Sequence, residues 1–307
     1  MESKDPKAQA PAPVGAQTQV TPKPAAPKPG PAPKTMNQKV AEAEKISKIK
    51  GVKNAFIVII LCAIAGVCIF LFAMGAPGNF EGGDTNNHPL NLAGTVYKGG
   101  FIVPILMTLL LTVIVLSVER AIALKSASGR GNTPKFVKNI KMLLASNKID
   151  EAMQLCRQQK GSVASVVYNT LVKYKELDAN KTLSKEQKLT TLRNEVEEAT
   201  ALEMPSLSQN LPIIATLTTL GTLVGLLGTV MGMIKSFQAL ATSGSPDSTE
   251  LSTGISEALV NTAFGIATGA FAVISYNFFT NKIDNLTYAI DEIGFSIVAT
   301  FAATHEG

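Results

Sequence analysis

Four long apolar segments divide the chain, and each is long enough to cross a bilayer. They predict transmembrane helices at residues 55–74, 101–124, 211–238 and 254–280, because a helix needs about 20 apolar residues to span the hydrocarbon core. The first segment carries no charged residue. The fold class predicted from this pattern is an all-α integral membrane protein with four transmembrane helices.

The segments between and after these spans are polar but keep helical periodicity. Within residues 125–210, Ser184 and Gln187 fit a helix-capping box, and a stripe follows it at Leu189, Leu192, Val196, Ala199 and Leu202. In residues 281–307, apolar side chains recur at intervals of three and four, at Ile283, Leu286, Ile290, Ile293, Ile297 and Phe301. We expect a helical domain that is formed by the loop between helices 2 and 3 and by the C-terminal helix, as a continuation of the last span.

The N-terminal region differs from the rest of the chain. Residues 1–36 contain nine of the sixteen prolines and almost nothing that could be buried, which predicts a disordered tail. Residues 37–53 lose the prolines and gain lysines, which is typical of a basic segment beside a membrane surface.

The distribution of basic residues predicts the orientation in the membrane. Residues 1–54, 125–210 and the C-terminal segment fall on one side and carry ten, fourteen and one Lys or Arg. The loops at 75–100 and 239–253 fall on the other side and carry one and none. The positive-inside rule therefore places both termini and the helical domain in the cytoplasm, and the two loops in the periplasm.

Composition excludes several classes of function. A mean hydropathy of +0.22 with 17% charged residues fits a membrane protein. The sequence has no basic patch interleaved with aromatic residues, so no nucleic acid is expected as a partner. Two histidines and three cysteines form no metal-binding pattern, and we expect no metal, cofactor or disulfide. No nucleophile, base and orienting group converge, so an enzyme is not expected.

Small and hydroxyl side chains form stripes on the third and fourth spans. The third span carries Thr218, Thr222, Gly225, Thr229, Gly232 and Ser236 at intervals of three and four. The fourth span carries one stripe of Glu257, Asn261, Gly265, Thr268, Ala272 and Ser275, and another of Gly254, Ala258, Thr262, Gly265 and Gly269. Such stripes suit either close helix packing, in which hydroxyls bond back to their own helix, or a polar path.

Glu257 is the one acid that lies wholly within an apolar run. An ionisable side chain inside a membrane is costly and indicates function, but a carboxylate also suits a helix N-terminus, and both interpretations remain open. Glu257 and Thr262 lie about 140° apart around a helix, so we expect them to face different neighbours. A lone acid is a poor path for protons, which predicts a second ionisable group from a partner chain.

Three sequence stretches carry a resemblance to a known family. They are Gly225-Leu-Leu-Gly-Thr-Val-Met-Gly-Met-Ile234, Gly254-Ile-Ser-Glu-Ala-Leu259 with Asn261-Thr262-Ala263, and Tyr276-Asn277, and Glu119-Arg120 also fits. The sequence resembles the MotA/TolQ/ExbB proton channel family and within it is most like ExbB, although the span at 55–74 and the Pro-rich tail are additions.

The resemblance implies a multi-pass bacterial inner-membrane protein that forms a homo-oligomer, as a pentamer. Its partners would be an ExbD-like single-span protein with a membrane aspartate and a TonB-like force transmitter. Thr229, Thr262 and Glu257 match the family's path residues, and Thr218, Thr222, Asn261 and Thr268 extend that candidate path. The candidate packing residues are Gly225, Gly228, Gly232, Gly265 and Gly269.

Several functions fit these features. The leading hypothesis is an ExbB-like subunit of a motor that couples proton flow to force on TonB for outer-membrane transport. Within the family, a TolQ-like, gliding or MotA-like stator subunit is the alternative, although the Gly254–Leu259 stretch argues against MotA. From another class, the chain could be a self-contained transporter, for which no inverted repeat is evident, or a structural membrane scaffold.

Overall fold

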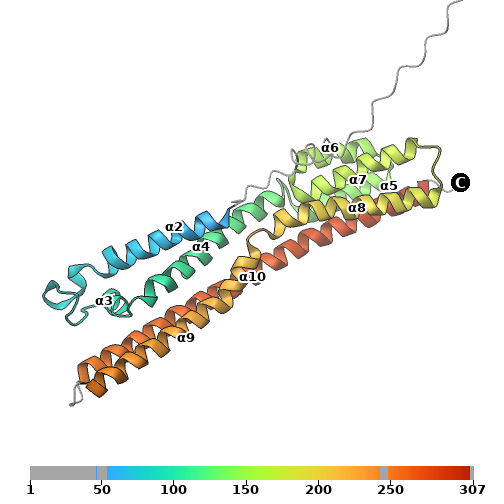
Figure 1. Cartoon of the computed structure of the whole chain (residues 1–307). Helices are drawn as coiled ribbons and strands as arrows, with labels where there is room; N and C mark the ends of the chain where they lie inside the picture. The colour runs from blue at the N-terminus through green and yellow to red at the C-terminus, as the bar shows by residue number, and fades with distance from the viewer. Residues whose placement is uncertain (1–45, 47–53, 243–247, 305–307) are drawn as a thin grey trace, which may run out of the picture. The chain divides into compact units, whose positions relative to one another are not determined.

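The computed structural model describes Ile46, residues 54–242 and residues 248–304. The predicted tail at 1–36 and nearly all of the basic segment at 37–53 lie outside the described residues. The described part is helical along most of its length and contains no strand, apart from one isolated bridge between Phe80 and Pro89. The prediction of an all-α membrane protein is confirmed, because four helices are long and apolar enough to cross a membrane (Figure 1).

The first two candidate spans pack against each other. Helix α2, Ala55–Cys68, continues as a π-helical turn, Ile69–Met74, and packs on α4, Ile102–Ala127. Gly66 allows this approach, because a side chain there would lie 3.0 Å from the Thr108 hydroxyl. Most other large side chains of α2 are exposed, as expected for a helix that borders lipid.

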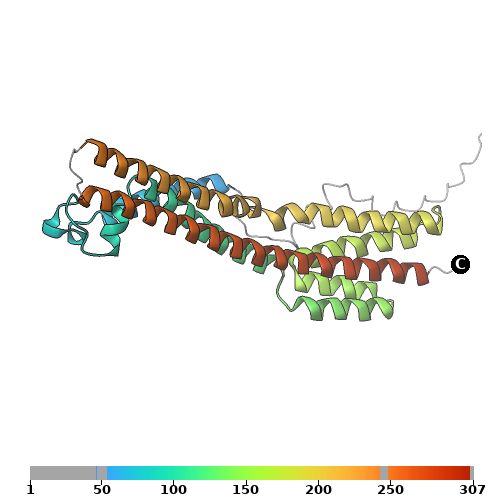
Figure 2. The ribbon, with the colours of Figure 1, turned by 90° about the horizontal axis from the view of Figure 1, so that it is seen from below.

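The other two candidate spans belong to helices that extend into the predicted loop at 239–253. Helix α9 spans Leu211–Thr242 and helix α10 spans Ser248–Thr304. Helix α10 continues without a break past residue 280, and it packs along both α9 and the helical domain (Figure 2). One rigid helix therefore joins the membrane part to the domain.

The predicted loop at residues 75–100 contains short helical elements. Two 3₁₀ turns, Pro77–Asn79 and Glu81–Gly83, precede helix α3, Leu92–Tyr97. The ring of Tyr97 stacks on Phe70 with centroids 4.8 Å apart and meets Phe80 edge-on at 5.5 Å. These aromatic contacts fix the loop over the ends of the first two spans.

The helical domain contains α5, Thr133–Ala145; α6, Ile149–Gln159; α7, Gly161–Ala179; and α8, Lys185–Ser208. The predicted capping box at Ser184 and Gln187 is confirmed, since each side chain bonds the other's backbone N–H. The predicted α10 seam is also confirmed, because all six of its apolar residues are buried in the domain core.

The stripe predicted on α8 is wrong at its last residue, because Leu202 is 56% exposed.

Cys156 lies in the same core as the α10 seam, and burial raises the pKa of its thiol. That thiol therefore stays neutral and packs as a small apolar group.

Candidate functional site

Helices α9 and α10 pack along a seam of glycines at very short range. A Cβ atom added at Gly225 would lie 2.8 Å from the Cα of Gly265, and one at Gly265 would lie 2.7 Å from the Cα of Gly225. Because the facing atoms are backbone, neither helix can yield by a side-chain rotation. All five predicted packing glycines lie in this seam, together with Gly221 and Gly254.

The closest point of the seam gives the first prediction. Gly225→Val should lower the free energy of unfolding by about 1–3 kcal/mol, the usual cost of forcing extra atoms into a packed interior. Denaturant unfolding of the purified protein in detergent, followed by circular dichroism, measures the loss. Leu226→Val is the matched control, since Leu226 is 58% exposed on the same helix. Equal unfolding free energies for the two variants would contradict the packing role.

The predicted hydroxyls do not share one environment. Thr229 and Thr262 meet across the seam through a hydroxyl–hydroxyl hydrogen bond, and the Thr229 hydroxyl also donates to the Gly225 carbonyl at 3.2 Å. Thr268 is fully buried against α9 and donates back to its own helix. Thr218 and Thr222 also donate back to α9, and Thr222 is exposed. The structure thus brings Thr229 and Thr262 together, while the other three bond only within their own helices.

Asn261 and Glu257 lie where α10 faces both α9 and the turn before α4, since Asn261 packs against Gly228 and Glu257 lies beside Gly100. Asn261 is fully buried; its Nδ2 donates to the Gly99 carbonyl at 3.1 Å, while its Oδ1 has no hydrogen-bond partner among the described residues. Glu257 is buried beside Gly100, which has a φ of +77° and no side chain to collide with the carboxylate. A buried amide oxygen without a partner is costly in an apolar medium and marks a polar point inside the membrane part.

Sequence reasoning missed Lys235, which makes an ion pair with Glu257. Its Nζ donates to Glu257 Oε1 at 2.8 Å and lies 6.0 Å from the centre of the Phe101 ring. Glu257 is therefore not an unpaired charge, because the chain itself supplies a second ionisable group. A signal was present, since Lys235 is the only charged residue between Leu211 and Gln238. A further ionisable group from a partner chain stays a prediction.

The expectation that Glu257 and Thr262 face different neighbours holds only in part. Thr262 meets Thr229 and Glu257 meets Lys235, so both side chains contact α9. Lys235 reaches Glu257 through its long side chain. Glu257 also lies beside Gly100, in the turn before α4.

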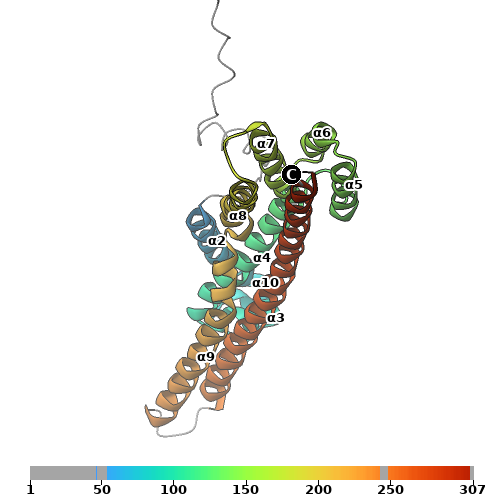
Figure 3. The same ribbon diagram turned by 90° about the vertical axis from the view of Figure 1, so that its right-hand side faces the viewer.

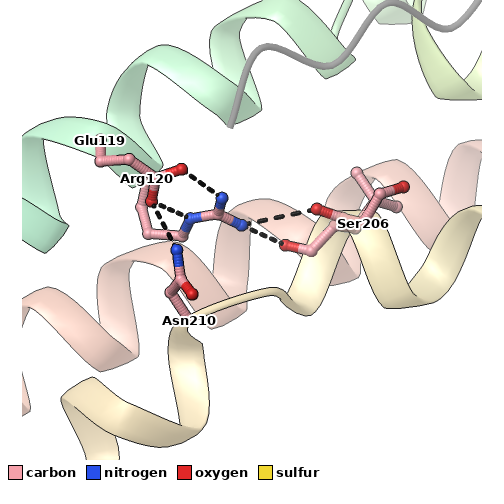
Figure 4. Close-up of polar contacts among 5 residues, drawn as sticks. Glu119, Arg120, Ser206 and Asn210 are labelled. Atoms are coloured by element: carbon pink, nitrogen blue, oxygen red, sulfur yellow. Dashed lines mark hydrogen bonds and ion pairs between the residues drawn. The ribbon is translucent and has the colours of Figure 1, made fainter. Parts of the chain in front are cut away.

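A second buried ionic cluster joins the membrane helices to the domain (Figure 4). Arg120, fully buried near the end of α4, makes two hydrogen bonds with the carboxylate of Glu119, at 2.6 and 2.7 Å. Its Nη1 also donates to the carbonyls of Ser206 and Leu207 at the end of α8, at 3.5 and 3.4 Å. Asn210, which starts the turn into α9 with a φ of +64°, donates to Glu119 at 3.2 Å. The cluster therefore caps α8 and fixes the joint between α8 and α9.

Together these features define a multi-pass all-α membrane protein in which a polar, closely packed helix pair extends into a helical domain. Residues 164–292, somewhat less than half of the chain, match the sequence profile of the MotA/TolQ/ExbB proton channel family. The match includes both the glycine seam and the Lys235–Glu257 pair, and it confirms the family resemblance predicted above.

The family match supports the coarser of the predicted functions, a subunit of a proton-driven motor. It also supports an oligomeric membrane complex with partner proteins. No curated protein matches the chain.

Proposed function

We propose that the protein is an ExbB-like channel subunit that couples proton flow to force on a TonB-like transmitter for outer-membrane transport. The observation that carries the proposal is the hydroxyl pair of Thr229 and Thr262, since both hydroxyls lie between the spans and within the residues that match the family profile. Hydroxyl groups both donate and accept hydrogen bonds, so they can form part of a chain along which protons move. In this proposal the protein acts as a channel subunit and not as an enzyme.

Further polar groups extend the proposed path along α10. Asn261 offers a buried amide oxygen without a partner among the described residues, and Glu257 offers a carboxylate one turn away. These groups lie in helices that are otherwise apolar, where polar side chains default to function. Three further predicted residues remain candidates for the path, although each hydroxyl donates to a carbonyl of its own helix. They are Thr218, Thr222 and Thr268.

The proposed location is the bacterial inner membrane, with both termini and the helical domain in the cytoplasm. The support is the charge distribution, since residues 125–210 carry fourteen Lys or Arg and residues 75–100 carry one. The proposed assembly is a homopentamer around an ExbD-like single-span protein with a membrane aspartate. The family match supports an assembly with partner proteins in general, and the particular partners are part of the proposal.

Proton flux tests the proposed path directly. The complex, isolated through a tag on this chain and reconstituted into vesicles with a pH-sensitive dye, should show a several-fold lower flux with Thr229→Val or Thr262→Val. Valine keeps the volume and branching of threonine and removes only the hydroxyl. Thr219→Val is the matched control, because Thr219 is an exposed threonine of α9. Unchanged flux in both seam variants would rule out this path and favour a structural scaffold.

The same preparation tests the partners. Mass analysis of the intact complex should reveal a single-span protein with a membrane aspartate alongside several copies of this chain. A second candidate, a MotA-like stator subunit, is favoured by the four candidate spans with a domain between the second and third. A co-purified partner with a peptidoglycan-binding domain in place of a TonB-like protein would support that candidate instead.

A further inference from the structure

The helical domain has two sites at which large apolar side chains are exposed. Among its described residues, four large apolar side chains are more than half exposed, namely Met142, Leu202, Tyr288 and Phe295. Tyr288 and Phe295 are 75% and 77% exposed and lie two turns apart on one face of α10. Exposed apolar groups of this size on a water-facing domain indicate an interaction surface.

The first site is a groove between α5 and α10. It has a volume of about 1010 Å³, and Met142 and Tyr288 line it together with Lys138, Lys141 and Lys282. In the described part of the chain, Lys141 pairs with Glu292 at 2.8 Å, while no carboxylate lies within 4.0 Å of Lys138 or Lys282. The groove therefore combines an apolar floor with net positive charge.

The second site is the exposed face of α8, which has the opposite charge. Leu202 projects from this face, and Glu198 lies one turn before it on the same face and is also exposed. Helices α5 and α8 pack on different sides of α10 (Figure 3). One molecule thus presents a basic groove on one side and an acidic apolar ridge on the other.

The two sites also lie at the same level along the molecule. Gly294 of α10 abuts Val196 of α8, and the Thr287 hydroxyl contacts the Met204 sulfur at 3.7 Å. The ridge at residues 198–202 is therefore level with residues 287–294, where the groove contains Tyr288 and Glu292. Copies of a membrane protein that share one orientation can form a ring only by rotation about the membrane normal, so contacting surfaces must be level.

We propose that the ridge of Glu198 and Leu202 docks into the α5–α10 groove of a second copy of this chain. Leu202 would cover Tyr288 and Met142, while Glu198 would meet the groove lysines. Because the two surfaces differ, each copy can bind two neighbours, and repetition of the contact closes a ring. The inference deepens the proposed function, since it names the domain surfaces that hold the motor subunits together.

Photo-cross-linking in membranes tests the contact. Tyr288 is replaced by p-benzoylphenylalanine, and chains with light and heavy nitrogen are co-expressed so that links between copies carry both labels. The expected product joins position 288 of one copy to residues 194–209 of another. The control places the same probe at Ala299, about 16 Å further along α10. Because the two surfaces must be level, this probe should link near residue 191 of the other copy instead. Links within one copy, to another protein or to lipid alone would overturn the proposal.

Charge reversal supplies an independent measurement. Glu198→Lys should lower the yield of the link between copies several-fold, because like charges then face each other. Lys138→Glu with Lys282→Glu should restore most of that yield in the reversed chain. Failure of the two lysine substitutions to restore the link would overturn the proposal. Cross-linking needs no proton flow, so this contact can be present even if the proposed proton path is wrong.

Discussion

Arg120→Met should lower the free energy of unfolding by about 3–5 kcal/mol, the cost of breaking a buried ion pair by removing one partner. The Glu119 carboxylate, 9% exposed, would lose both of its short hydrogen bonds to the guanidinium. The carbonyls of Ser206 and Leu207 would lose the donor that caps α8. Denaturant unfolding in detergent measures the loss, and hydrogen exchange should rise most at residues 204–214.

Two further variants separate the ion pair from a general effect of losing an arginine. Arg130→Met removes an exposed arginine near the same domain and should change the unfolding free energy by no more than about 0.5 kcal/mol. Glu119→Met combined with Arg120→Met should recover much of the loss, because no unpaired charge then remains buried. If the double variant is less stable than Arg120→Met alone, the pair is not the source of the stability.

The apolar pattern predicted the fold well because membrane spans and helix seams are local features of sequence. The α10 seam is the best example, since every apolar residue from Ile283 to Phe301 in the predicted set is buried. The continuation of the last span into the domain was predicted as well, and α10 runs unbroken between the two. The end of α9 was less predictable, since α9 continues to Thr242. Apolar spacing records which face is buried, but it does not record where a helix stops.

The part of the candidate site that lies on a single helix face could be predicted from the sequence. The stripe of Gly254, Ala258, Thr262, Gly265 and Gly269 does form the surface against α9. Contacts from distant segments could not be predicted, such as the Gly99–Gly100 turn beside Asn261 and Glu257. These contacts depend on how the loop at residues 75–100 folds over the spans, which no spacing rule describes.

The Lys235–Glu257 pair changes the electrostatics of the proposed path. A carboxylate that is buried alone in a membrane helix is costly, whereas one that accepts a hydrogen bond from an ammonium group at 2.8 Å is compensated. The Lys235 side chain is 47% exposed and that of Glu257 is 9% exposed, so the lysine lies between the carboxylate and the surroundings. We therefore expect Lys235 to position the carboxylate at that end of the seam.

Reversing each charge in turn should reveal this role as a loss and a rescue of proton flux. Lys235→Glu or Glu257→Lys places two like charges in contact, which costs several kcal/mol, and flux in the reconstituted complex should fall below about a tenth. The double swap restores opposite charges and should recover at least half of the flux. Lys125→Glu makes the same charge change on an exposed side chain near the end of α4, far from the Gly100 turn that contacts the pair, and should leave flux unchanged. A double swap no more active than either single variant would show that the pair does not position Glu257.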